Sequence, residues 1–521
     1  MMFYRATVLI GLLGVASTFW LYSRFTVDDA FITWRYGKNL IEYGIWNYSP
    51  SHLDLTQAYT NPIFAALSIL PPKLDFDVVL FFKIFGLVNL FAFVIWYARQ
   101  TKGSYVTLLL LLGMPATIVH VFGGLETFLY VSLMSALFVA LDKNNKSLSI
   151  GLALALFLTR PESWLLAALL PLFFLFKESP GKLDSSLLNQ FFAQFRHAKP
   201  DIASAITVGA ALIAPLLLYL FLNKAYFGYA LPNSFYAKSG AFFSIDQFIT
   251  LSFFISPLLL LVLYGKSKIF LLTSAYSMAL ALNYSMSNLQ MDYSARFAFH
   301  IFVPIFVFLV YISTTYKGHL KLELNNIKIA NATLETITKG FAVLFLLVLL
   351  KISGMVDAHM VTYYPRALDS HAALGKTLAQ IRESYKLQSF ALGDAGIAAY
   401  HSGLRALDNV GLGSALVTHE GLNSVTMDSY NPDLIAFHSR PNEIRLKDHN
   451  QAEIFKWATA RGFNYVCDIY WQSDYTLKLY SRTALPELRA VCEASKAKND
   501  RNNRSYLKSS WSTPPWHYWK E

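Results

Sequence analysis

Charge is scarce in this sequence. Only 15% of its 521 residues are charged, whereas 55% are hydrophobic and 16% are aromatic. Leucine- and phenylalanine-rich runs recur over the first two-thirds of the chain, which is typical of a polytopic membrane protein. The net charge of +11 does not indicate nucleic-acid binding. The basic residues cluster in short loops between apolar runs and form no basic stripe with interleaved aromatic residues.

Several catalytic signatures are missing as well. The sequence has no GxxxxGK[ST] loop, no HExxH and no GxSxG. These absences argue against nucleotide-driven transport, a zinc protease and a serine hydrolase. No cofactor is predicted, because the histidines lack metal-ligand spacing and are expected to pack or to lie at the interface. A carboxylate pair is able to bind a divalent cation, but nothing in the sequence indicates one. The histidines considered are His52, His120, His300 and His401.

Cysteine is nearly absent. The two cysteines, Cys467 and Cys492, both follow the last apolar run. If that part of the chain lies outside the cytoplasm, it lies where disulfides persist, and the count is even. We predict a disulfide between them, with two free thiols as the alternative.

What the sequence does contain is a series of apolar runs, which predicts about eleven membrane segments of ~20 residues. A further run at 61–70 is too short to span and is expected to be re-entrant or interfacial. The first run is expected to stay as a helix, because no small-residue cleavage site precedes Arg24. The predicted segments lie near 6–22, 77–98, 104–121, 125–141, 147–159, 162–176, 201–222, 248–264, 269–283, 297–313 and 337–356.

The loop charges predict an orientation. With the N-terminus in the cytoplasm, every inward loop is basic, as the positive-inside rule requires. An odd number of spans then places residues 357–521 on the outer side. We therefore expect a protein of the bacterial inner membrane, with a transmembrane module at 1–356, a first outer loop at 23–76 and a periplasmic domain at 357–521. That last region alternates strand-like and helical stretches, so its predicted fold is a small α/β domain.

This orientation gathers the unusual polar stretches on the outer side. Ionisable groups at membrane depth are rare and usually line a cavity, so their shared location predicts a site. The stretches are VDDAF at 27–31, AYTNP at 58–62, GGLETF at 123–128, TRPES at 159–163, YFGYALPNSFYAKSG at 226–240 and MDYSARF at 291–297.

Two adjacent carboxylates, Asp28 and Asp29, follow the first apolar run. The residues after them predict an interfacial helix with Phe31, Trp34 and Ile41 on the face toward the membrane. One Asp is able to cap this helix. Alternatively, one is a general base that takes a proton from a hydroxyl, and its neighbour would raise its pKa. The two roles are compatible.

Five other charged residues have two interpretations each. Arg160 and Glu162 either pair with each other, or Arg160 binds an anionic ligand and Glu162 orients it. Glu126 either caps a helix or belongs to the site. Lys238 and Arg296 contact lipid headgroups or bind a phosphate. The residues predicted to bind or orient substrate beside them are Arg35, Tyr59, Asn61, Asn233, Tyr236 and Tyr293.

In the outer domain, SFALGDAGIAAYHSG at 389–403 predicts a strand, a glycine-containing turn and a helix. Such a turn is able to bind an anion at the helix N-terminus, although a plain structural turn is the expected role. Trp471, Tyr475 and Trp511 either stack on sugar rings or pack in the core.

The stretch DDAFITWRYGKNLIEYGIWNYSP followed by AYTNP resembles the start of GT-C membrane glycosyltransferases. It is most similar to the terminal arabinofuranosyltransferases of cell-wall arabinan assembly and their relatives in lipopolysaccharide biosynthesis. The resemblance continues in order through GLET, TRPE, YFGYALPNSFYAKSG, ARF…PIF and GDAGIAAYHSG. The chain departs from that pattern with Ser163 after RPE and with Gln57-Ala58 before YTN.

The resemblance implies an inverting enzyme of envelope biogenesis. Such an enzyme transfers a sugar, arabinofuranose in the relatives, from a polyprenyl-phosphate donor to an envelope glycan or lipid acceptor. The transfer takes place on the outer face of the inner membrane. The base would be an Asp of the first outer loop, with Asp28 slightly favoured over Asp29. Arg160, Lys238 and Arg296 would bind the donor phosphate. The alternatives are a transporter or flippase of a lipid-linked sugar and a non-catalytic glycan-assembly factor.

Overall fold

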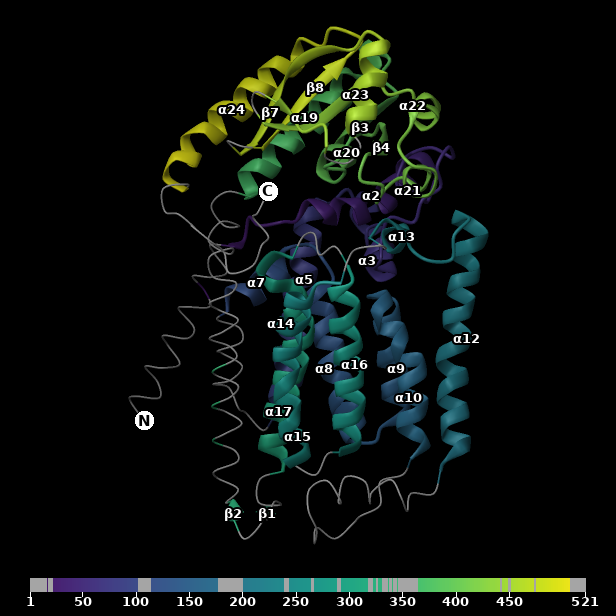
Figure 1. Cartoon of the computed structure of the whole chain (residues 1–521), viewed down its shortest axis with the longest axis vertical. Helices are drawn as coiled ribbons and strands as arrows, with labels where there is room; N and C mark the ends of the chain where they lie inside the picture. The colour runs from purple at the N-terminus through teal and green to yellow at the C-terminus, as the bar shows by residue number, and fades with distance from the viewer. Residues whose placement is uncertain are drawn as a thin grey trace.

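Figure 1 shows the computed structural model of the chain, in which upright helices lie beneath a domain that contains the main sheet. Apart from the single positions 16, 336, 340 and 344, the structure describes residues 22–101, 114–176, 200–238, 243–263, 267–287, 292–316, 322–324, 327–329, 364–440, 443–447, 451–472 and 475–506.

Three described helices are long and apolar enough to cross a membrane: α5 (Val78–Gln100), α12 (Ile202–Phe227) and α17 (Arg296–Thr315). A fourth is obtained if α7 (Pro115–Phe122) and α8 (Thr127–Asp142), which meet at a bend of 111°, count as one broken span. This agrees with a membrane protein. The prediction of about eleven spans is wrong for the part of the chain that the structure describes.

The overestimate has a physical reason. Several predicted spans form apolar helices of 10–17 residues, which are shorter than the ~20 residues that a span needs. The predicted spans 6–22 and 337–356 lie outside the described residues except for the single positions 16, 22, 340 and 344, and residues 104–113 of the span 104–121 lie outside them too. The shorter apolar elements are α9 (Lys146–Phe157), η1 (Pro161–Leu165) with α10 (Leu166–Leu175), and α14 (Ile245–Ile255) with η2 (Ser256–Leu258) and α15 (Leu259–Leu263).

Helix α17 forms the centre of the helical region. It is buried along nearly its whole length, and its rings pack on two sides, Phe308 against Phe138 of α8 and Phe302 against Phe254 of α14. Helix α12, by contrast, stands at the edge and exposes most of its apolar surface. Together with α16 (Ser267–Ser285), these helices run side by side under the outer domain (Figure 1).

Short helices fill the layer between the upright helices and the outer domain. The first is α2 (Asp28–Tyr43), which ends where Gly44 adopts a left-handed conformation, φ 70°, and returns its N–H to Leu40. The run at 61–70 forms α3 and begins α4, both far too short to span. The other short helices of this layer are α3 (Pro62–Leu67), α4 (Leu70–Lys73), α13 (Asn233–Lys238) and η3 (Tyr293–Ala295). The small hairpin of β1 (Leu322–Leu324) and β2 (Ile327–Ile329) lies at the opposite end of the helices (Figure 1).

The apolar face of α2 does not lie on the membrane surface as predicted. Phe31 and Trp34 are both buried, and Trp34 stacks on Phe82 of α5 with ring centroids 4.7 Å apart. Ile41 alone of the three is exposed. The helical spacing was read correctly, but this face packs against protein.

The outer domain contains a six-stranded mixed sheet with flanking helices, as the α/β prediction expected. The strand order is β4-β3-β5-β8-β7, with β6 paired to β5; β3 is parallel to β4 and β5, and the other pairs are antiparallel. The elements are α19 (Tyr364–Tyr385), β3 (Ser389–Leu392), α20 (Ile397–Ser402), β4 (Arg405–Asp408), α21 (Ala415–Glu420), α22 (Ser424–Tyr430), β5 (Leu434–Arg440), β6 (Glu443–Ile444), α23 (Gln451–Ala460), β7 (Asn464–Gln472), β8 (Tyr475–Ser481) and α24 (Glu487–Tyr506).

A disulfide joins Cys467 of the edge strand β7 to Cys492 of α24. It links the last described helix to the sheet. Trp471, one of the candidate sugar-stacking residues, packs against Tyr364 and His371 inside the domain. Trp511 lies outside the described residues.

Candidate functional site

A polar cluster lies beneath the outer domain, where six segments of the chain meet. They are the start of α2, the residue before α3, the bend between α7 and α8, the turn between α9 and η1, the end of α13 and the start of α17. These are the stretches whose shared location the loop charges predicted.

Glu126 is the hub of this cluster. Its Oε1 accepts hydrogen bonds from Nη1 of Arg160 and Nη2 of Arg296, both at 2.7 Å, and its Oε2 accepts from Nδ2 of Asn61 at 2.6 Å. Glu162 binds the other edge of Arg160, at 2.6 and 3.2 Å. The predicted Arg160–Glu162 pair therefore exists, but it is part of a larger buried network of two carboxylates and two guanidinium groups.

Backbone geometry puts Glu126 and Arg296 in place. Gly124 has φ +80°, and a Cβ there would lie 2.6 Å from the Trp34 ring, so the sharp α7–α8 bend requires glycine. Ser294 and Ala295 both have φ 52° just before Arg296. Left-handed backbone costs about 1–2 kcal/mol per non-glycine residue. Such strain is typical of functional positions.

Asp28 is a structural anchor. Its two carboxylate oxygens accept hydrogen bonds from the backbone N–H groups of Gly396 at 3.1 Å and Ile397 at 2.8 Å, at the start of α20. The residue that caps its own helix is Val27, which offers no side-chain bond. The predicted capping of its own helix is therefore wrong, because Asp28 binds N–H groups at the start of a helix of the outer domain. Burial, reinforced by the charge of Asp394, raises the pKa of Asp28 to about 8.

Asp29 has a different environment. Among the described residues, its carboxylate accepts no hydrogen bond, and its side chain is partly exposed. Burial raises the pKa of Asp29, while the positive charges of Lys238 and Arg296 oppose the rise. The two carboxylates therefore differ, because the Asp28 oxygens are held by backbone N–H groups and the Asp29 oxygens accept no hydrogen bond from the described residues.

Helix α13 brings Lys238 to the cluster and two other predicted residues to the outer domain. Asn233 donates to the Leu412 carbonyl at 3.2 Å and the Thr418 hydroxyl at 3.1 Å. Tyr236 lies edge-on to His419, with ring centroids 4.8 Å apart. Both therefore hold the two regions together. Lys238 forms no ion pair within the described part of the chain, and burial lowers its pKa while Asp29 opposes that change.

The structure removes two predicted residues from the cluster. Arg35 is buried, donates to the Leu404 carbonyl and lies over the Tyr48 ring at 4.8 Å. Tyr59 accepts a hydrogen bond from the Trp46 indole at 3.1 Å within an aromatic group. Neither contacts the cluster residues, so neither is placed to orient a substrate there. Of Tyr293 the backbone is described, in η3, but not the side chain.

Sequence reasoning missed the carboxylate of Asp394, in the loop after β3. The Tyr475 hydroxyl contacts both its oxygens, at 2.9 and 3.1 Å, and Nε2 of His438 lies 3.5 Å from Oδ1. Nδ1 of His371 lies 3.9 Å from Oδ2. The only signal was the Gly-Asp at the end of a predicted strand; the two histidines come from distant positions and gave none.

Further contacts fix the outer domain on the first outer loop. Asp54 accepts backbone N–H groups at the start of α21, from Ala415 at 3.1 Å and Leu416 at 3.3 Å, and the Tyr430 hydroxyl at 2.6 Å. The Tyr48 hydroxyl donates to the Ala395 carbonyl at 2.6 Å. Two carboxylates of the first loop, Asp28 and Asp54, thus cap two helices of the outer domain.

The contact between Asp28 and Gly396 gives a stability prediction. A Cβ on Gly396 would lie 2.2 Å from the Asp28 backbone oxygen and 2.4 Å from its carboxylate. We expect Gly396→Ala to lower the free energy of unfolding by about 1–3 kcal/mol, as overpacking does. The melting temperature and the midpoint of chemical unfolding in detergent would measure this. Gly151→Ala is the matched control, because a Cβ there meets nothing within 4 Å. Equal melting of both variants would contradict the close contact.

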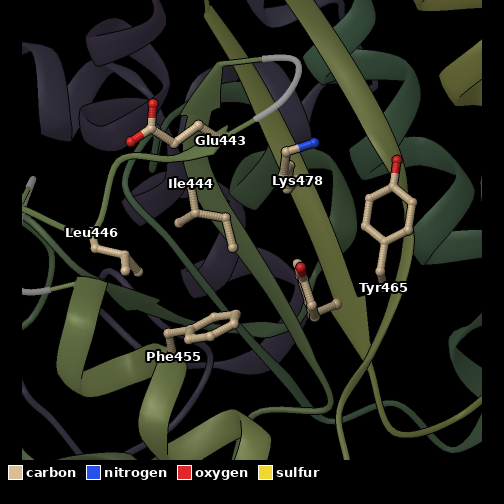
Figure 2. Close-up of a pocket in the computed structure, with 7 residues that line it drawn as sticks. Glu443, Ile444, Leu446, Phe455, Tyr465 and Lys478 are labelled. Carbon is tan, nitrogen blue, oxygen red and sulfur yellow. The ribbon is translucent and has the colours of Figure 1, made fainter.

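A separate hollow of about 600 Å³ lies on the outer domain, with the rings of Phe455 and Tyr465 on opposite sides (Figure 2). Two of its polar groups are already engaged, since the Lys478 ammonium and the Tyr465 hydroxyl both bind Asp468, at 3.0 and 3.1 Å. None of its lining residues belongs to the polar cluster. They are Glu443, Ile444, Leu446, Phe455, Tyr465, Lys478 and Tyr480.

No group of three or more His, Cys, Asp or Glu side chains within the described ranges is arranged to hold a metal ion. Although Asp28, Asp29 and Asp394 lie near one another, Asp28 is engaged with backbone N–H groups. The described residues therefore give no candidate metal site.

Comparison with known proteins adds one finding. A family model described as a domain of unknown function, DUF8728, matches residues 361–484. This range spans most of the outer domain and includes Asp394, His371 and His438. A search of curated proteins gave no match to the chain.

Proposed function

We propose that this protein is an inverting glycosyltransferase of the GT-C type. It would move a sugar from a polyprenyl-phosphate donor to a hydroxyl of an envelope glycan or lipid acceptor. The observation that carries the proposal is the environment of Asp29. It is a partly exposed carboxylate without a hydrogen-bond donor among the described residues, and the positive charges of Lys238 and Arg296 act on it. A base and a cationic site for the leaving phosphate are what this reaction needs.

The proposed phosphate site contains two of the three basic residues that the sequence suggested. Arg160 uses Nη1 on Glu126 and both Nε and Nη2 on Glu162, so it is committed to the network. Arg296 uses Nε on Thr127 and Nη2 on Glu126, which leaves Nη1 for a ligand. The donor phosphate is therefore assigned to Lys238 and Arg296, and Arg160 becomes a residue that positions Glu126.

The reaction balances with these groups. An acceptor hydroxyl oxygen attacks the anomeric carbon while the bond from that carbon to the phosphate oxygen breaks. The proton of the hydroxyl passes to the Asp29 carboxylate, and the polyprenyl phosphate leaves with the bonding electron pair. Lys238 and Arg296 stabilise the charge that develops on the phosphate. The raised pKa of Asp29 makes it a stronger base than an exposed Asp.

The setting suits a lipid-linked donor. The cluster lies at one end of the apolar helices, below the outer domain, where a polyprenyl chain in the bilayer would present its phosphate and sugar (Figure 1). The proposed location is the bacterial inner membrane, with the outer domain in the periplasm. The resemblance to terminal arabinofuranosyltransferases makes arabinofuranose the first sugar to test.

The test uses the purified full-length protein in lipid vesicles with a synthetic polyprenyl-phosphate arabinofuranose and a glycan acceptor. We expect release of polyprenyl phosphate together with a new glycosidic bond, and no product from a nucleotide sugar. A panel of other polyprenyl-phosphate sugars follows if arabinofuranose is refused. Movement of the intact donor across the bilayer without its cleavage would refute the enzyme and support the flippase.

A further inference from the structure

The edge of the outer-domain sheet that faces Asp28 has the geometry of a ligand site. Strands β3, β4 and β5 are parallel, and the chain runs from β3 to β4 on one side and then to β5 on the other. In open α/β sheets, ligands bind beyond the carboxyl ends of the strands where the strand order reverses in this way. Asp394 lies in the loop that leaves β3 at that end.

The Asp394 carboxylate is rigidly held but not enclosed. Its side chain is 22% exposed, whereas its neighbours His371 and His438 are 0% and 8% exposed. Tyr475 contacts both carboxylate oxygens. A carboxylate fixed from behind by buried groups and open on one side is pre-organised to accept hydrogen bonds from a ligand.

His371 points independently to a ligand. It is fully buried, and neither ring nitrogen has a hydrogen-bond partner within the described residues. Buried polar atoms are normally paired, so each exception requires an explanation. Its Nδ1 lies 3.9 Å from Oδ2 of Asp394, too far for a hydrogen bond. A single hydroxyl at ~2.8 Å from each atom would bond to both.

Asp394 also lies close to the start of α2, which carries the proposed base Asp29. Two residues further along, the Gly396 N–H binds the Asp28 carboxylate at 3.1 Å. The charge of Asp394 raises the pKa of both Asp28 and Asp29, so the carboxylates act on one another. Lys238 and Arg296 come from α13 and α17, whereas Asp394 comes from the outer domain.

From this arrangement we propose that Asp394 binds a hydroxyl group of the sugar acceptor, with His371 as the second partner of that hydroxyl. The inference rests on the proposed function. It assigns the donor to the membrane helices and the acceptor to the outer domain, so that the two regions share one site around Asp29. Burial lowers the pKa of His371 to about 4, which leaves the ring neutral and able to donate one hydrogen bond at physiological pH.

The experiment measures transfer kinetics of the full-length Asp394→Asn variant in vesicles. A hydrogen bond to a charged group contributes about 1.5–3 kcal/mol, so the acceptor KM should rise roughly 10- to 100-fold. Cleavage of the donor by water, measured without acceptor, should change far less than the acceptor KM, whereas a merely structural defect would lower donor cleavage and transfer equally. Asp468→Asn is the control, since Asp468 is a similarly buried carboxylate of the same domain paired with Lys478.

Two additions keep the result decisive. If Asp394→Asn does not fold, Tyr475→Phe removes the hydroxyl that holds Asp394 and keeps the ring, and a several-fold rise in acceptor KM is expected.

Saturation-transfer NMR with methyl arabinofuranoside and methyl mannopyranoside tests acceptor binding without any donor. An unchanged acceptor KM, or an equal fall in donor hydrolysis, overturns the inference. Absence of donor cleavage by the wild type would instead overturn the proposed function, while saccharide binding lost in Asp394→Asn would still support the acceptor site.

Discussion

Replacement of Asp29 by Asn is expected to lower kcat for sugar transfer by about 10²- to 10⁴-fold, the usual contribution of a general base. The amide has nearly the same shape but cannot take the acceptor proton. Because the Asp29 carboxylate accepts no hydrogen bond from the described residues, its replacement removes no contact that holds the fold. The melting temperature should therefore stay close to that of the wild type. Transfer assays in vesicles and thermal unfolding in detergent measure the two quantities.

Asp28→Asn is the matched control, and its expected effects are reversed. An amide can accept the N–H of Gly396 or Ile397 through its oxygen, but its NH2 group faces the other donor, so stability should fall. Its kcat for sugar transfer, calculated per folded molecule, should fall less than that of Asp29→Asn. A variant pair in which Asp28→Asn is inactive and stable, and Asp29→Asn is active, would return the base role to Asp28.

The pH profile adds a second readout for Asp29. Only the deprotonated carboxylate is a base, so kcat/KM should rise with pH through the pKa of Asp29, and burial moves that pKa upward from its ordinary value. Lys238→Met removes the first of the two positive charges that oppose this shift. The rise in kcat/KM should then move to higher pH. A shift to lower pH would contradict the proximity of the two groups.

Removal of the Glu126 carboxylate is expected to have the largest effect on stability. Glu126 is 1% exposed and bonds to two arginines, so Glu126→Gln leaves two buried positive charges with Glu162 as their one remaining carboxylate in the network. Breaking a buried ion pair by removing one partner typically costs about 3–5 kcal/mol. Chemical or thermal unfolding in detergent would measure the loss.

A double variant distinguishes charge from packing. Glu126→Gln combined with Arg296→Gln removes one charge of each sign and should recover part of the lost stability. The exposed pair of Glu453 and Lys456, whose side chains are 58% and 73% exposed, is the control. Glu453→Gln should change stability by less than about 1 kcal/mol. A double variant less stable than Glu126→Gln alone would mean that Arg296 contributes by packing and not by charge.

The polar cluster was the most predictable part of the site. Glu126, Arg160 and Arg296 each lie next to the end of a predicted apolar segment. The loop charges alone were enough to assign these ends to one side of the membrane. The span count was less predictable, because hydropathy does not distinguish a surface in contact with lipid from one in contact with protein. Helix α17 is as apolar as α12, yet α17 is buried within the protein and α12 is exposed along most of its length.

The role of Asp28 could not be read from the sequence. Its partners Gly396 and Ile397 are 368 and 369 residues away, and nothing in the local pattern of either stretch indicates the other. The same holds for Asp394, whose histidine neighbours lie on α19 and β5. Local patterns offered helix capping as one role for an Asp of the pair and a plain structural turn as the expected role of the Gly-Asp stretch. They gave no indication that these two features bind each other.

The capping of outer-domain helices by Asp28 and Asp54 has a consequence for biosynthesis. The first outer loop leaves the ribosome some 360 residues ahead of the N–H groups that it binds. At about 5–20 residues per second, this delay is roughly 20–70 s. Both carboxylates must remain hydrated during that interval, so the loop cannot reach its final conformation during insertion of the early helices. A nascent chain that ends before Tyr364 already carries Asp29, Glu126, Lys238 and Arg296, but it lacks the domain that holds α2 in position. Assembly of the site is therefore a late, post-insertion event that waits for the outer domain to fold.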